Sequence, residues 1–207
     1  YDTQNGFHIY KNDYALPMGF TFDTYVSRSQ WETYSESDRC NLLLRALVLE
    51  DDAVEMYQKD MQKLPDAVHQ MSDEDLLAEC TERTKTACDS FTYNSKGFHA
   101  TISTDHENLV FFSVPWEEGW SAEVNGEPVA IEKADIGFMA VPVAAGDSEI
   151  TFTYHTPGLK AGALLSLGGL VLFAGYLTVA GIYNKRHPNP KTESICCVDY
   201  STEETAN

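Results

Sequence analysis

The residues best suited to ligand chemistry lie in the motif WEEGW, where Glu117 and Glu118 stand between Trp116 and Trp120. Aromatic faces stack on pyranose rings and carboxylates accept hydrogen bonds from sugar hydroxyls, so Trp116, Glu117 and Glu118 could form a carbohydrate-contacting loop. The alternative, which we favour, is that Trp120 belongs to a β-sandwich core and the two glutamates form a solvated turn. Adjacent carboxylates also do not establish the pair facing one cleft, about 5–10 Å apart, that glycoside hydrolysis needs.

His99 and His106, with Asp105 beside the second, are the remaining candidates for a metal site. Two histidines with this separation match no specific ligand spacing, and strand alternation would bring them together only by coincidence of register. The sequence also lacks G-x-S-x-G, Walker, HExxH and CxxC patterns. We therefore predict no metal site and no cofactor in this chain.

Two pairs of residues leave structural alternatives open. Asp23, in FTFDTYVS, and Arg45, in LLLRALVL, either form an ion pair that holds a helix against a strand, or both face water. Cys80 and Cys88 would be separated by about 12 Å in a continuous helix, whereas the Cα atoms of a disulfide lie within about 7 Å. A bridge therefore requires the helix to end between them.

The composition predicts a globular, acidic protein. Apolar residues make up 43% of the chain and aromatic residues 12%, which is enough for a packed core. The formal net charge of −18 would repel phosphate backbones, so we expect no nucleic-acid partner. Because the sequence begins at Tyr1, without a methionine or a secretory leader, we expect it to be a piece of a longer protein.

One segment, AGALLSLGGLVLFAGYLTVAGIY from Ala161 to Tyr183, carries no charge. As a helix rising about 1.5 Å per residue it would reach about 34 Å, enough to cross a hydrocarbon core of about 30 Å. Lys185, Arg186 and Lys191 follow its end, so the positive-inside rule places the following tail in the cytoplasm. The segment is therefore predicted to be a transmembrane helix.

Three segments follow from that prediction. Residues 1–160 form an extracytoplasmic domain, residues 161–183 the transmembrane helix, and residues 184–207 a short cytoplasmic tail that we expect to be disordered. Glycines are spread along the helix, and small residues let a second helix approach closely. The expected partners are the lipid bilayer and other transmembrane helices of the parent protein.

The domain is predicted to be mainly β, an antiparallel β-sandwich or jelly-roll, because short apolar runs follow one another with turn signals between them. The runs are LVFFSV, WSAEV, PVAIE, FMAVPV and EITFTY. Asn125-Gly126 favours a type I′ hairpin, and Ala145-Gly146-Asp147 should make another turn. SFTY and GFHATIS, on either side of residues 94–97, predict a further hairpin. The N-terminal runs GFHIY and FTFDTYVS are expected to join the same sheets.

A helical insertion is predicted at about residues 36–88. Its first helix has apolar residues at helical spacing and Ser37 as the expected N-cap. The apolar residues are Leu42, Leu43, Ala46, Leu47 and Leu49. Ser72 and Asp75 give the S-x-x-D start of a second helix.

Three segments resemble the C-terminal end of the YfhO family of bacterial membrane proteins: YALPMGFTFDTYVS, LLLRALVLED and the stretch from LVFFSVPWEEGW to TPGLKAG at residues 109–162. The pattern W-x-A-x-V-[ND]-G, then Gly-Phe, then A-G-x-x-x-I-x-F-x-Y is shared with several outward-facing sugar-transferase modules. LPMGF together with LLLRALVL is more particular to this family.

The resemblance implies a multi-pass protein of the GT-C kind in the bacterial cell membrane. Such a protein uses a polyprenyl-phosphate sugar outside the membrane to decorate an envelope polymer such as lipoteichoic acid. Its acidic catalytic residues lie in an early outer loop that this chain does not contain. The chain is then a non-catalytic domain with the last transmembrane helix, with an envelope polysaccharide or a polyprenyl-linked sugar as further partners. The alternative is a structural or carbohydrate-binding surface module whose parent is not a transferase.

Overall fold

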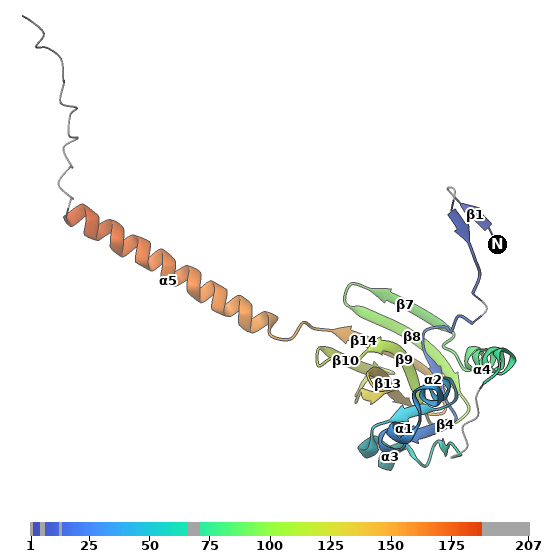
Figure 1. Ribbon diagram of the computed structural model, residues 1–207. Helices are drawn as coiled ribbons and strands as arrows, with labels where there is room; N and C mark the ends of the chain where they lie inside the picture. The colour runs from blue at the N-terminus through green and yellow to red at the C-terminus, as the bar shows by residue number, and fades with distance from the viewer. Residues whose placement is uncertain (1, 5–6, 13, 66–70, 188–207) are drawn as a thin grey trace, which may run out of the picture. The chain divides into compact units, whose positions relative to one another are not determined.

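The computed structural model describes residues 2–4, 7–12, 14–65 and 71–187. The chain divides into two units, Tyr1–Pro157 and Gly158–Asn207, and each is described by itself (Figure 1). Among the described residues, the first unit contains two large β-sheets and four short helices. The second contains one long helix.

The first large sheet has five strands in the order β11-β10-β14-β8-β7, and every pair is antiparallel. Its strands are β7 (Ser90–Asn94), β8 (Gly97–Thr104), β10 (Trp120–Val124), β11 (Glu127–Val129) and β14 (Gly146–Tyr154). Asn125 and Gly126 have φ of 54° and 81°, so the predicted type I′ turn between β10 and β11 is confirmed. The predicted β7–β8 hairpin is confirmed too, because Asn94 pairs with Gly97 across a two-residue loop.

The second large sheet has seven strands in the order β3-β9-β13-β12-β5-β4-β6. Their bounds are β3 (Phe20–Thr21), β4 (Thr24–Ser27), β5 (Leu47–Leu49), β6 (Gln62–Lys63), β9 (Asn108–Pro115), β12 (Glu132–Ala134) and β13 (Phe138–Val143). The run PVAIE, predicted as one strand, is divided between β11 and β12, which lie in different sheets. The two sheets confirm the predicted β-sandwich.

Both faces of the seven-stranded sheet are buried. Val110 and Phe112 of β9 belong to a core cluster made by both sheets, together with residues of β8, β10 and β14. The alternating residues Leu109 and Phe111 belong to a second cluster, which includes Ala53 of helix α3 (Asp51–Tyr57). A strand buried on both faces reads as a continuous apolar run, and LVFF is such a run.

The region between β4 and β6 corrects the sequence-based prediction. Helix α2 (Glu36–Arg45) ends before Leu47 and Leu49, which were expected on it but form strand β5. Residues 46–49 are all buried, and four consecutive buried positions fit a central strand better than one face of a helix. The N-cap is Ser35, whose Oγ accepts from Asp38 N, and not Ser37.

Strand β4 pairs in parallel with both β5 and β6, so the expected purely antiparallel arrangement is wrong here. Parallel neighbours need crossover connections. Helices α1 (Arg28–Thr33) and α2 connect β4 to β5, and α3 lies between β5 and β6. The predicted helical insertion therefore contains two sheet strands. The later helix α4 (Asp73–Lys85) begins with the predicted box, because Ser72 and Asp75 cap each other's backbone.

Two buried polar side chains join distant parts of the chain around this sheet. Asp135 Oδ1 accepts a hydrogen bond from Val48 N at 2.8 Å, and Asp135 N donates to Val48 O at 2.9 Å. Burial raises the pKa of the Asp135 carboxyl to about 7. On α4, the buried Arg83 donates through Nη1 to Thr21 O at 2.8 Å, and its guanidinium lies over the ring of Phe22.

At the N-terminus, β1 (Asp2–Gln4) pairs with β2 (Phe7–Ile9) in a separate two-stranded sheet. The expectation that GFHIY joins the sandwich is therefore wrong. FTFDTYVS, in contrast, supplies β3 and β4 of the seven-stranded sheet, as predicted.

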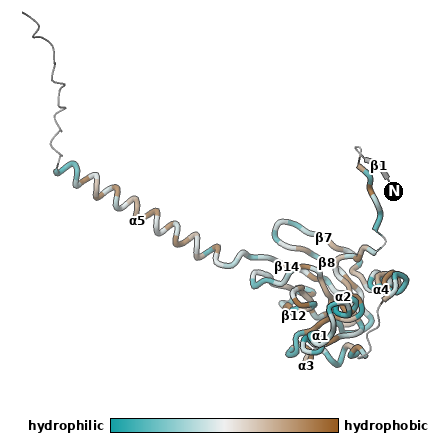
Figure 2. Tube along the Cα trace, viewed as in Figure 1, coloured by the Kyte–Doolittle hydropathy of each residue, from teal (hydrophilic) through white to brown (hydrophobic). Residues whose placement is uncertain are grey.

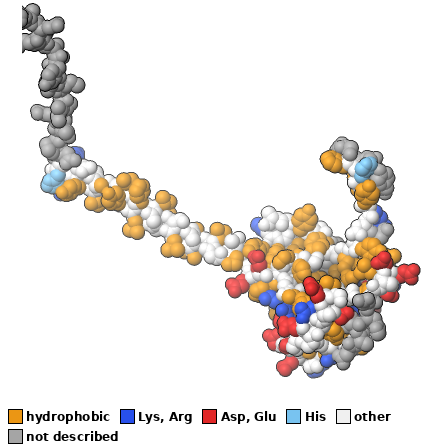
Figure 3. All heavy atoms as spheres, viewed as in Figure 1, with side chains coloured by type: hydrophobic (Ala, Val, Ile, Leu, Met, Phe, Trp, Pro, Cys, Tyr) orange, Lys and Arg blue, Asp and Glu red, His pale blue; other side chains and the backbone are white. Residues whose placement is uncertain are grey.

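The second unit is helix α5 (Leu159–Arg186), which contains the segment predicted to span the membrane. It is the one helix in the described residues long and apolar enough to cross a bilayer, and none of its residues is buried. Figure 2 shows apolar and neutral residues along its length, and Figure 3 shows hydrophobic side chains spread along it. A helix without a polar face suits lipid, so α5 is a transmembrane helix. Most of the predicted tail, from residue 188, lies outside the described residues.

Candidate functional site

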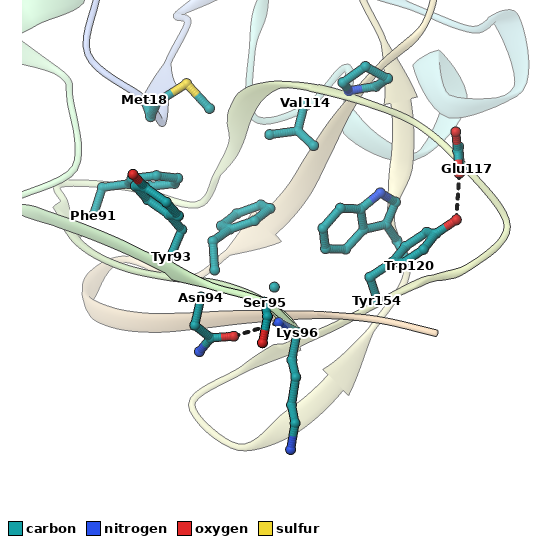
Figure 4. A pocket seen from close by; sticks show the side chains of 13 residues that line it. Met18, Phe91, Tyr93, Asn94, Ser95, Lys96, Val114, Glu117, Trp120 and Tyr154 are labelled. Atoms are coloured by element: carbon teal, nitrogen blue, oxygen red, sulfur yellow. Dashed lines mark hydrogen bonds between the residues drawn. The ribbon is translucent and has the colours of Figure 1, made fainter. Parts of the chain in front are cut away.

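The sandwich carries a cavity of about 570 Å³ between the β7–β8 hairpin and the WEEGW loop (Figure 4). We call it the aromatic groove and define it by its aromatic residues and the carboxylate at its rim. These residues are Phe91, Tyr93, Phe98, Glu117, Trp120 and Tyr154. Met18 and Val114 lie along the opposite wall in Figure 4. The groove is thus lined mainly by ring faces and aliphatic groups.

Strand pairing brings the rings of the groove together. Trp120 of β10 lies directly opposite Tyr154 of β14, with ring centroids 5.0 Å apart. Trp120 also packs edge-on against Phe98 of β8 at 5.6 Å. Phe98 is buried and belongs to the sandwich core, whereas Trp120 is half-buried. The groove therefore has a rigid floor continuous with the core, and Trp120 serves both as core and as lining.

A tight turn positions Glu117 at the groove. Trp120 N donates to Glu117 O at 3.2 Å, and His155 N donates to Gly119 O at 2.8 Å, so the loop is tied to the end of β14. A Cβ on Gly119 would lie 2.6 Å from both His155 O and the ring of Tyr154. Glycine at this position therefore allows the tyrosine ring to approach the loop backbone.

Tyr154 Oη donates a hydrogen bond to Glu117 Oε2 at 2.7 Å (Figure 4). This bond raises the pKa of the Tyr154 hydroxyl, because the ionised phenol would lose it and face the carboxylate charge. The tyrosine is thus kept as a neutral donor, and the carboxylate is held at the rim. The remaining lone pairs of the Glu117 carboxylate are available to accept hydrogen bonds from the hydroxyl groups of a ligand.

The structure divides the residues predicted to contact carbohydrate. Glu117 lines the aromatic groove, whereas Trp116 and Glu118 line a separate hollow of about 350 Å³, which Glu117 also borders. The Lys133 ammonium lies 4.7 Å from the centre of the Trp116 ring and covers one face of it. Both glutamates are exposed and lie on a turn, as the simpler alternative expected.

Sequence reasoning missed Phe91, Tyr93 and Tyr154 as lining residues. The available signal was the repeated pattern F-T-Y at the ends of two strands, SFTY and TFTY. In a strand, residues two apart face the same side, so each pattern places a phenylalanine and a tyrosine on one face. What the pattern does not contain is the pairing of both strands with β8, which brings these rings to one end of the sheet.

The two histidines take separate positions. His99 of β8 lies 2.8 Å from Glu149 of the neighbouring strand, through Nε2 and Oε1. His106 lies in the turn between β8 and β9 and is exposed. Among the residues that the structure describes, no group of three or more His, Cys, Asp or Glu side chains is arranged to hold a metal ion.

The structure shows neither an Asp23–Arg45 ion pair nor a Cys80–Cys88 disulfide. Asp23 is exposed, and Arg45 lies near Glu79 of α4, with Nε 3.5 Å from Oε1. The ion pair therefore joins two helices and does not hold α2 against the strand. Cys80 and Cys88 are free thiols although α4 ends between them at Lys85. Burial raises the pKa of Cys88 to about 12.

Comparison with known proteins agrees with a membrane setting. The family model described as bacterial membrane protein YfhO matches residues 66–166. An uncharacterized protein YfhO from Bacillus subtilis (strain 168) is 28% identical over 124 residues, which is 60% of this chain and 13% of that protein. No solved structure matches. Both matches support the chain being a fragment of a protein of the YfhO family of bacterial membrane proteins.

Proposed function

We propose that this chain is the C-terminal extracytoplasmic domain and last transmembrane helix of a YfhO-like protein that transfers a sugar from a polyprenyl-phosphate donor to a cell-envelope polymer such as lipoteichoic acid. The domain is non-catalytic and positions the acceptor by holding a sugar in the aromatic groove. Family membership and helix α5 support the membrane setting. The aromatic groove is the observation that carries the role of the domain.

The groove has the two features that sugar binding requires. The apolar faces of pyranose rings pack on aromatic side chains, and Trp120 and Tyr154 supply such rings. Sugar hydroxyls need oriented acceptors, and Glu117 is held in place by Tyr154. A volume of about 570 Å³ falls within the range of about 300–1,000 Å³ common for small-ligand sites.

The charge of the chain bears on which part of an acceptor is held. A polymer such as lipoteichoic acid carries phosphates, and a chain with a net charge of −18 repels them. The groove, lined by rings and aliphatic groups, is suited to the sugar substituents of such a polymer. Binding should therefore require sugar on the acceptor and should not be strengthened by its phosphates.

The matched test compares Glu117→Gln with Glu118→Gln in the full-length parent. Both glutamates are exposed neighbours, but Glu118 lies outside the groove. A hydrogen bond to a charged acceptor is worth about 1.5–3 kcal/mol, so Glu117→Gln should weaken acceptor binding about tenfold and lower the sugar content of the envelope polymer. Glu118→Gln should leave it near the wild-type level. Unchanged decoration in both variants and after deletion of the domain would leave only a structural role.

A second candidate is a carbohydrate-binding module whose parent is not a transferase. Glu117 is the one carboxylate among the described residues that line the groove, so the groove alone cannot supply a pair of acids. In this case Glu117→Gln weakens saccharide binding while envelope glycosylation stays the same. Measuring binding and decoration on the same variants separates the two candidates.

The proposed orientation places the domain outside and the tail in the cytoplasm, supported by Lys185 and Arg186 in the last turn of α5. Cys40 is exposed on the domain, while Cys196 and Cys197 follow the helix. A membrane-impermeant maleimide applied to intact cells should label the protein through Cys40. The label should disappear in Cys40→Ser and persist when Cys196 and Cys197 are replaced. The reverse pattern would show that the domain lies in the cytoplasm and the tail outside.

A further inference from the structure

The tip of the β7–β8 hairpin, Tyr93 to Lys96, exposes an aromatic ring to solvent. Tyr93 is 83% exposed, more than any other large hydrophobic side chain in the described residues. Ser95 and Lys96 beside it are exposed as well, and in Figure 4 the Lys96 side chain extends away from the aromatic groove. An amphipathic ring next to a cation, left without cover, indicates a surface that meets a partner.

The hairpin tip lies beside the end of the strand that leads to the membrane. Gly97 of β8 pairs with Thr153 of β14, and Tyr154 N donates to Lys96 O at 2.7 Å. From Tyr154 to Leu159, the first residue of α5, is five residues. An extended chain of that length spans at most about 18 Å. Covalent geometry alone therefore keeps this end of the sandwich close to the bilayer.

The residues at the tip are the types that bind at a lipid interface. Tyrosine is enriched where lipid headgroups meet acyl chains, because its ring is apolar and its hydroxyl is polar. Lysine extends its amine to lipid phosphates while its methylenes stay in the apolar layer. The tip contains one cation and no carboxylate, in a chain with a net charge of −18. It can therefore approach anionic headgroups that the acidic surface elsewhere would repel.

We propose that the hairpin tip rests in the lipid headgroup layer, with the Tyr93 ring at the boundary with the acyl chains and Lys96 Nζ at the lipid phosphates. Because Tyr93 also lines the aromatic groove, the rim of the groove then lies at the bilayer surface. This contact does not depend on what the groove binds.

The test uses the full chain in vesicles of phosphatidylcholine and phosphatidylglycerol whose acyl chains are brominated near the glycerol. Tyr93→Trp adds a fluorophore at the tip, and Met56→Trp on α3, where Met56 is 56% exposed, is the matched control. The emission added by Tyr93→Trp should fall by about half, and that added by Met56→Trp by about a tenth or less, because the bromines quench only nearby rings. Equal or weaker quenching at position 93 would overturn the proposal.

A second variant tests the cation. Adding Lys96→Glu to Tyr93→Trp should reduce quenching at least about twofold in vesicles with phosphatidylglycerol, and less in pure phosphatidylcholine, because only the anionic lipid repels the new carboxylate. If quenching changes neither with Lys96→Glu nor with the charge of the lipid, the role of Lys96 is overturned. Neither measurement involves a saccharide, so failure of the groove to bind sugar leaves them interpretable.

Discussion

The two halves of the sandwich domain are built in different ways. Residues 90–154 pair with one another only in the antiparallel sense, and short connections join β7 to β8, β10 to β11 and β12 to β13. Within residues 20–64, strands β4, β5 and β6 pair in parallel and are linked by helices, and their sheet is completed by partners from far along the chain, such as Asp135 with Val48. The first half supplies nearly all of the aromatic groove, whereas the second half is held by buried contacts. Substitutions in the second half should therefore change stability, and those at the groove should change binding.

The largest effect is expected from Leu49→Ala in β5. Leu49 is fully buried in the cluster beneath α3, and emptying such a site costs about 2–5 kcal/mol of unfolding free energy. Leu77→Ala on α4, where the side chain is 42% exposed, should cost far less. Chemical denaturation followed by circular dichroism measures both. Equal losses at the two positions would break the comparison.

Arg83→Met should have the next largest effect. Arg83 reaches Thr21 O from α4 and covers Phe22, so its loss removes a charged hydrogen bond worth about 1.5–3 kcal/mol. Lys85→Met, two residues on and exposed, removes a surface pair with Glu82 worth about 0–1 kcal/mol. The same denaturation experiment distinguishes them. A loss for Lys85→Met as large as that for Arg83→Met would show that the buried contact is unimportant.

The raised pKa of Asp135 implies that the free energy of unfolding depends on pH. Its folded-state pKa is raised from 3.8 to about 7, so the folded protein binds a proton more tightly than the unfolded chain. The associated stability is complete below about pH 4 and is lost as the pH rises through about 7. Asp135→Asn keeps an acceptor for Val48 N and tolerates the positive φ of 43°, so it should flatten this loss. An unchanged difference in melting temperature between pH 5 and pH 8 would contradict this assignment.

The smallest effect on stability is expected at the groove. Glu117→Gln weakens the hydrogen bond and removes the charge that together raise the pKa of Tyr154, so this pKa should fall in the variant, as followed by NMR of the tyrosine ring carbons. Glu118→Gln should leave it unchanged, because Glu118 makes no hydrogen bond to Tyr154. The free energy of unfolding should change by less than about 1 kcal/mol in both variants, because both glutamates are exposed. A large loss of stability in Glu117→Gln would mean that the groove is a structural part of the core.

The same contrast explains which parts of the fold the sequence predicts. The hairpins of the antiparallel half follow from local signals such as Asn125-Gly126, and the membrane helix from a long uncharged run. Strand β5 does not, because Leu47 and Leu49 satisfy helical spacing and only their burial on both faces shows the strand. The S-x-x-D pattern that predicts the start of α4 also occurs as S-E-S-D at residues 35–38, where α2 begins after Ser35.

The candidate site was predictable only in part. Of the predicted contacts Trp116, Glu117 and Glu118, only Glu117 lines the aromatic groove, and Trp120, predicted as a core residue, lines it as well. Tyr93 and Tyr154 lie near these residues because β7 and β14 both pair with β8. The sequence of one strand does not determine the register of such pairing. Buried polar groups such as Asp135 are also invisible in the sequence, because their partners are backbone atoms.

The most direct test of the central claim is saccharide binding by the full chain in lipid nanodiscs. The probe is a deacylated, glycosylated lipoteichoic acid fragment, titrated while the fluorescence of Trp120 and its neighbours is recorded. The groove predicts saturable binding that weakens about tenfold in Glu117→Gln, stays the same in Glu118→Gln and vanishes when the sugars are removed from the fragment. Absence of binding, or equal binding by both variants, would contradict the assignment of the aromatic groove as a sugar site.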